Sequence, residues 1–135
     1  MTTYKQAVIA MGAYFNTSWA GATTVVWGDN DPQDTPSGSW VRFNINHNDG
    51  RQASMGAPAA NMFRQIGIIT VQIFTAEGDS GVAARDLADS VLEIYHGARD
   101  SGIEYYNATA REIGNDGNGF YQVNVLVEFK YDNIT

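Results

Sequence analysis

Alternating apolar and polar positions from residue 120 to residue 131 form the clearest pattern in the chain. The apolar positions of this segment are Tyr121, Val123, Val125, Val127, Phe129 and Tyr131. The residues between them are polar, with Leu126 as the exception. Because successive side chains of a strand point to opposite faces, this pattern predicts an antiparallel strand buried on one face. The preceding G-N-D-G-N-G is a dense turn signal and predicts a hairpin with a strand over 103–113.

Three more strands are predicted in the first half of the chain. Residues 22–27 have the β-branched composition of a strand, and residues 40–46 and 66–74 alternate between apolar and polar positions. The apolar faces of the two alternating strands carry Val41, Phe43, Ile45, Ile69, Val71 and Ile73. Residues 28–39 are rich in Gly, Pro, Asp and Ser, which predicts a loop between the first two strands.

Apolar residues at three- and four-residue spacing predict two helices, over 3–18 and 80–98. Thr2 or Thr3 could cap the first helix. The order of elements is then helix, three strands, helix and two strands. This order predicts one α+β domain spanning residues 1–135, with a mostly antiparallel sheet of about five strands and two helices packed on one face.

The connection from residue 47 to residue 65 is unusually long for a link between two strands. It contains apolar residues that would be poor choices for a solvated linker, and it is flanked by arginines, a type enriched at interfaces. We therefore expect residues 48–65, the hairpin arm, to contact another subunit or a partner; the alternative is that it folds back over its own sheet edge. Alternation also places Trp40 on the polar side of its strand, where either a helix or loop of its own chain covers it or a partner does. The candidate interface residues are Trp40, Arg51, Met55, Met62, Phe63 and Arg64.

Composition narrows the classes of function. The chain has no cysteine, which excludes disulfides, thiolate metal sites and cysteine nucleophiles. It contains no apolar run long enough for a membrane helix and no signal-peptide pattern at the N-terminus, so we expect synthesis in the cytoplasm. The net charge is −7, and the eight basic residues are scattered, which predicts no stable binding to nucleic acid.

No residue pattern points to catalysis, a cofactor or a metal. His47 and His96 have no second ligand at metal-binding spacing, and no known nucleophile or phosphate-binding motif is present. The acidic stretch D-N-D-P-Q-D lacks the glycine and the glutamate of a calcium-binding loop. Glu104 and Glu112 share a strand face but lie too far apart for a carboxylate pair. We therefore predict no catalytic, cofactor or metal site.

Several segments together resemble the tail terminator proteins of long-tailed bacteriophages, those of the lambda type above all. These segments are S-W-V-R-F-N-I-N-H, R-Q-A-S-M-G, M-F-R-Q-I-G-I-I-T-V-Q-I-F, L-A-D-S-V-L-E-I-Y and F-Y-Q-V-N-V-L-V-E-F-K-Y-D. The resemblance implies a structural virion protein that forms a hexameric ring at the head-proximal end of the tail. Such a ring caps the tail tube, stops its polymerisation, meets a head-completion or neck protein, and lets DNA pass through its lumen.

Three other functions stay open at this stage. The chain could be another neck or head-completion protein of a phage particle, which would share a small α+β fold. It could be a small-molecule binding module, although the predicted core faces are almost wholly apolar and offer few converging polar groups. It could be a small hydrolase that uses two carboxylates, which Glu104 and Glu112 are badly placed to supply.

Overall fold

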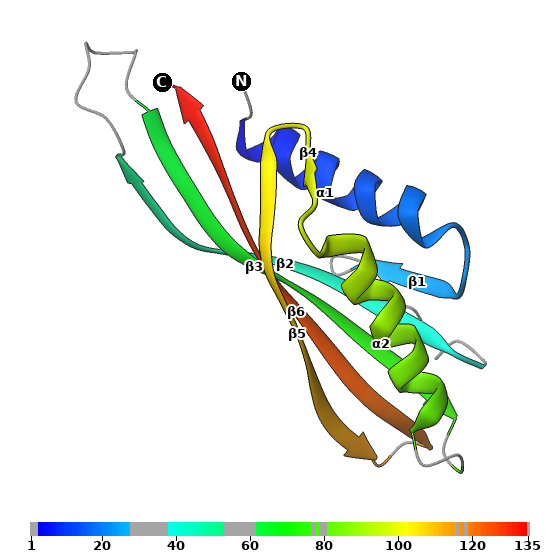
Figure 1. Cartoon of the computed structure of the whole chain (residues 1–135). Helices are drawn as coiled ribbons and strands as arrows, with labels where there is room; N and C mark the ends of the chain where they lie inside the picture. The colour runs from blue at the N-terminus through cyan, green and yellow to red at the C-terminus, as the bar shows by residue number, and fades with distance from the viewer. Residues whose placement is uncertain are drawn as a thin grey trace.

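In the part of the chain that the structure describes, two helices lie on one face of a twisted six-stranded sheet (Figure 1). The computed structural model describes residues 3–27, 38–52, 62–76, 78, 81–115, 117 and 119–134. The elements are α1 (Tyr4–Trp19), β1 (Thr24–Trp27), β2 (Trp40–Gln52), β3 (Met62–Ala76), α2 (Val82–Tyr95), β4 (Arg99–Asp100), β5 (Ile103–Asn115) and β6 (Phe120–Ile134). Across the sheet the strands run in the order β1-β2-β3-β6-β5-β4.

The prediction of about five mostly antiparallel strands was wrong in two respects, although the α+β class holds. First, β1 pairs with β2 in parallel, from Thr24 opposite Trp40 to Trp27 opposite Phe43, so the sheet is mixed. Parallel neighbours need a long return connection, and the stretch between β1 and β2 supplies it, but a four-residue strand carries no sequence signal of its direction. Second, the two-residue β4 forms an additional edge strand against β5.

The hairpin arm is also more regular than its sequence suggests. β2 continues to Gln52 and β3 begins at Met62, so much of the predicted loop forms paired strands. β6 accompanies β3 along this whole length and ends opposite Met62. The described part of the arm has no alternating apolar pattern, because Met62 and Phe63 are adjacent and residues 48–52 are polar apart from Gly50, so the sequence does not reveal this pairing. Figure 1 shows the ends of β2, β3 and β6 reaching past α2.

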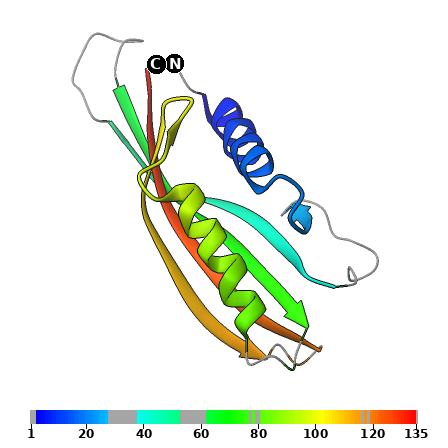
Figure 2. The ribbon, with the colours of Figure 1, turned by 45° about the vertical axis from the view of Figure 1, so that its right-hand side comes forward.

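Both helices cover the same face of the sheet, which we call the helix face; the other is the open face (Figure 2). The core lies between the helices and the central strands. Phe15 of α1 is fully buried and stacks on Phe43 of β2, with 4.9 Å between the ring centroids. The predicted alternation of the last strand is confirmed, because Val123, Val125, Val127, Phe129 and Tyr131 are at most 2% exposed.

The two helices form where the sequence predicts them, and local chemistry explains how each begins. At α1, the Gln6 amide donates to Thr3 Oγ1 at 3.2 Å, while the Thr3 amide donates to Gln6 Oε1 at 3.1 Å. This reciprocal pair satisfies two amides that a helix start otherwise leaves unpaired. α2 begins after Gly81, whose φ is 78°, and a Cβ there would lie 2.5 Å from the ring of Tyr121. Both features exclude larger residues at that position.

Candidate functional site

Trp40 lies on the open face, as its strand alternation predicts, but neighbouring side chains of its own chain bury it. Its side chain is 6% exposed and stacks on Phe74, with 4.2 Å between the ring centroids. Phe120 meets the indole edge-on at 6.1 Å, and the Arg42 guanidinium lies 5.8 Å from the ring centroid. Any part that Trp40 takes in an interface is therefore indirect, through the residues it holds in place.

The predicted residues of the hairpin arm lie together at its base, as far as the structure describes them. Arg51 of β2 is exposed and stands opposite Arg64 of β3, while Met62 and Phe63 are half-buried at the start of β3. Met55 lies outside the described residues. Two arginines opposite each other on adjacent strands repel, which favours an acidic partner for at least one of them.

Arg64 has such a partner on the next strand. Its Nε and a terminal nitrogen donate to the two carboxylate oxygens of Asp132 in β6, at 2.9 and 3.2 Å. Hydrogen bonding to this carboxylate raises the pKa of the Arg64 guanidinium. The bidentate geometry joins β3 to β6 near the base of the arm, so the guanidinium is already engaged within its own chain.

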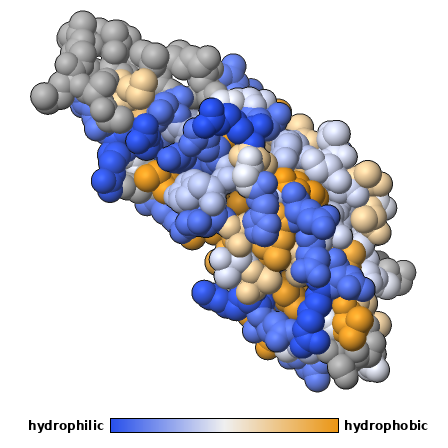
Figure 3. Space-filling view, in the orientation of Figure 1, coloured by the Kyte–Doolittle hydropathy of each residue, from blue (hydrophilic) through white to orange (hydrophobic). Residues whose placement is uncertain are grey.

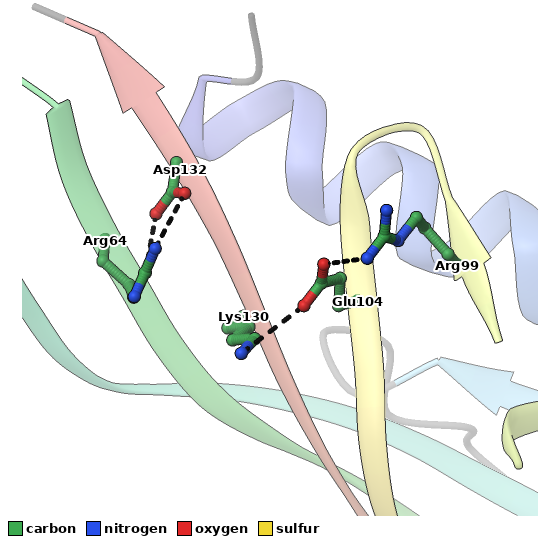
Figure 4. A network of polar contacts seen from close by, with 5 residues as sticks. All are labelled: Arg64, Arg99, Glu104, Lys130 and Asp132. Atoms are coloured by element: carbon green, nitrogen blue, oxygen red, sulfur yellow. Dashed lines mark hydrogen bonds and ion pairs between the residues drawn. The ribbon is translucent and has the colours of Figure 1, made fainter. Parts of the chain in front are cut away.

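A second ion-pair group continues this row toward the far edge of the sheet (Figure 4). Lys130 of β6 lies 3.4 Å from Glu104 of β5, and Glu104 also pairs with Arg99 of β4. Charged pairs at partly exposed sites contribute little each, but this group joins β4, β5 and β6, and the Arg64–Asp132 pair adds β3. The sequence does not reveal this group, because Lys130 lies far along the chain from Arg99 and Glu104 and only the pairing of β5 with β6 brings them together.

The open face carries mainly amide and hydroxyl side chains, and no helix of the described chain covers it. Half-buried or exposed residues there include Asn44, Asn46, Thr70, Gln72, Asn107, Thr109, Gln122 and Asn124. Gln122 donates to Asn124 at 2.9 Å, and Asn107 donates to Glu128. Ile68 and Leu126 are half-buried among them and line a shallow hollow. This face is polar enough to stand in water and flat enough to meet another protein.

A groove of about 650 Å³ runs between α1 and the outer edge of β2. Val8 and Gly12 of α1 form one wall, Trp27 closes the end where β1 stops, and residues 43–46 of β2 form the other wall. The groove occupies the position that a longer β1 would fill. Exposed apolar residues include Ile9 and Val82. On the face seen in Figure 3, apolar residues are interspersed with polar ones.

His47 is part of the packing between α1 and the sheet. It forms a hydrogen bond of 2.8 Å with the Tyr131 hydroxyl and lies against the ring of Tyr4, with 4.5 Å between the centroids. Burial lowers the pKa of His47. Within the described part of the chain, no three His, Asp or Glu side chains gather where they could hold a metal ion.

The glutamates that could have formed a carboxylate pair lie at separate places along β5. Glu104 pairs with Lys130 and Arg99, whereas Glu112 pairs with Arg85 of α2 on the helix face. Each is therefore neutralised by basic neighbours of its own.

Among the described helices, none is long and apolar enough to cross a bilayer.

Comparison with known proteins shows a shared fold with a solved structure. No protein family and no curated protein matches the sequence. A solved structure whose name states no function superposes on the chain with a TM-score of 0.65 and 15% identity. The match covers 90% of this chain and 92% of the other. At this identity the similarity shows a shared fold alone.

Proposed function

We propose that the protein is a structural component of a phage virion, a tail terminator whose copies form a ring, six-membered by resemblance, at the head-proximal end of the tail tube. The observation that carries this proposal is the resemblance of its strand and helix segments to tail terminators. In this role the ring caps the tube, stops its polymerisation and offers a surface to the neck or head-completion protein.

The segments that carry the resemblance are scattered in the sequence but adjacent in space. Four of the five fall on residues 39–47, 62–74, 87–95 and 120–132, which belong to β2, β3, α2 and β6; the fifth, 51–56, begins at the end of β2 and lies mostly outside the described residues. β3 lies between β2 and β6 in the sheet, and α2 packs on β3 and β6. The resemblance therefore covers the centre of the domain, which supports a common architecture for the subunit.

The surface of the domain is compatible with this role. A ring subunit needs contact areas on different sides of the same domain, one for each neighbour. The polar open face and the hairpin arm offer such areas on a small domain. A net charge of −7 suits a conduit that lets DNA pass without holding it, because like charge repels the phosphate backbone.

Disruption of the gene in a phage that carries it tests the proposal. A tail terminator limits tube growth, so particles without it should carry overlong tails of variable length in electron micrographs. Expression of the intact protein in the same host should restore a uniform tail length. Full heads without tails, beside tails of normal length, would instead indicate a neck or head-completion protein and would overturn the terminator assignment.

A further inference from the structure

Among the described residues, no strand pairs with the outer edge of β2 beyond the end of β1. β1 pairs with β2 only as far as Phe43, and from Asn44 to Gly50 the pairing of β2 within the described residues is to β3 alone. The first part of this stretch, Asn44–Asn46, lines the groove beside α1. An unpaired strand edge exposes a row of backbone donors and acceptors that can accept another strand.

On the opposite side of the sheet, most of the outer edge of β5 likewise has no strand neighbour in the described part of the chain. β4 accompanies β5 at Ile103 and Glu104, and the Tyr105 amide donates to the Ala98 carbonyl at 3.1 Å. From Tyr106 to Asn115 the described pairing of β5 is to β6 alone. Two apolar side chains stand exposed on this edge, Tyr106 at 44% and Ile113 at 50%.

The directions of the strands make these two edges complementary. β3 and β6 are each antiparallel to their neighbours, so β2 and β6 run one way and β3 and β5 run the other. A second copy related by rotation about an axis along the strands keeps these directions. Its β5 would therefore run antiparallel to β2 of the first copy, which is the more stable kind of pairing.

We propose that copies of this protein join by strand addition, with the β5 edge of one copy entering the groove between α1 and the β2 edge of the next. The contact is heterologous, because two different edges meet, and repeated contacts of this kind close into a ring or continue as a filament. That the contacts close into a ring rests on the proposed function. The pairing of β5 with β2 does not depend on it.

The side chains of β5 fit the groove. Ala108 and Ala110 stand opposite Val127 and Val125 of β6, which are buried on the helix face, so both alanines share that face. They are small, and Ala110 is exposed. In the assembly they would meet the wall of α1 at Val8 and Gly12, and their small size lets the strand approach that wall closely.

Bulges set the length of the contact. β5 has irregular register between Tyr105 and Asn107 and again between Glu112 and Gly114, so its regular part is 107–112. The register of β2 shifts between His47 and Asp49, which lie beyond the groove. Bulges are a common means of limiting pairing along an edge. A short, bounded pairing of this kind suits a specific contact rather than open-ended aggregation.

A matched pair of lysine substitutions tests the contact. A110K places a charge on the helix face of β5, where the neighbouring α1 would cover it, whereas T109K places the same charge one residue away on the open face. Both positions are exposed in the single chain, so both variants should fold normally. Light scattering over a concentration series should show association weakened at least about tenfold for A110K and nearly unchanged for T109K.

Cysteine cross-linking tests which edges meet, and the absence of native cysteine makes the result simple to interpret. N46C lies on the open face of β2, and T109C and R111C lie on the open face of β5. Oxidised mixtures of N46C with T109C or R111C should yield mixed dimers, in clear excess over those from any single variant alone. The mixed cross-link should disappear when A110K is added to the β5 variant.

These outcomes separate the contact from the proposed function. A wild-type oligomer that A110K leaves intact, with no mixed cross-link, overturns the strand-edge contact while a tail ring built through another surface remains. Mixed cross-links in an open filament that never closes on tubes support the contact and contradict the terminator role. A wild-type protein that stays monomeric at the highest concentration, with no cross-link, overturns the inference.

Discussion

Replacing Gly67 by alanine should destabilise the protein, and the atoms packed around Gly67 determine how large the loss of stability is. Gly67 of β3 stands opposite His47 and Phe129, and no side chain fits between them. A Cβ at this position would overlap the carbonyl oxygen of Asn46 and lie 2.5 Å from Cζ of Phe129. Both neighbours belong to the sheet, so neither moves without disturbing a strand or the core.

Overpacking of this kind costs about 1–3 kcal/mol, and contact with backbone places Gly67→Ala near the upper end. For a domain of this size, about 3 kcal/mol lowers the melting temperature by about 10 °C. Urea unfolding of the monomer, followed by circular dichroism, measures the change directly.

Gly12→Ala is the matched control. Its Cβ would meet Trp27 at 3.7 Å, an ordinary contact, and alanine favours a helix interior over glycine by about 1 kcal/mol. The two identical substitutions should therefore change stability in opposite directions. If Gly67→Ala is neutral, or if both variants shift alike, the packing of β3 against Phe129 described here is incorrect.

Other predictions concern the core, the histidine and DNA. Phe15→Ala should cost about 3–5 kcal/mol of unfolding free energy, whereas the exposed Thr17→Ala should change it by about 0.5 kcal/mol or less; chemical denaturation compares them. The folded-state pKa of His47 is lowered, so the unfolded chain binds more protons and stability should fall as the pH drops below about 6.5. Denaturation midpoints at pH 7.5 and 5.5 should differ less in His47→Gln. In gel shifts with duplex DNA at physiological salt, micromolar protein should show no retained band; a band that persists would show that the charge argument is wrong.

The sequence predicted the elements in which apolar residues recur with a strong, regular period. The alternation from Tyr121 to Tyr131 follows directly from one buried face, and α1 begins at the threonine whose hydroxyl caps it. The parallel direction of β1 could not be predicted, because Thr24–Trp27 has the same composition in either direction. β4 could not be predicted either, because two residues carry no period and only the turn at Ser101 and Gly102 brings them against β5.

For the candidate interface residues too, the sequence could not predict which neighbours the fold brings into contact. Alternation placed Trp40 on the polar side of its strand, but only the fold shows that Phe74 and Phe120 bury it there. Arginine at position 64 suggested an interface, whereas the strand order gives it Asp132 as a partner, which is 68 residues away in the sequence. Open strand edges leave no mark in the sequence of one strand, because an edge is defined by which neighbours a strand lacks. The interface residues on the hairpin arm therefore remain a prediction.

Electron microscopy of tail tubes polymerised in the presence of the purified protein tests the central claim most directly. A terminator binds one end of the tube as a closed ring and halts elongation there, so tubes should carry a single ring at one end and become shorter as the protein concentration rises. Tubes that keep growing, with the protein absent from their ends or spread along their length, would contradict the account.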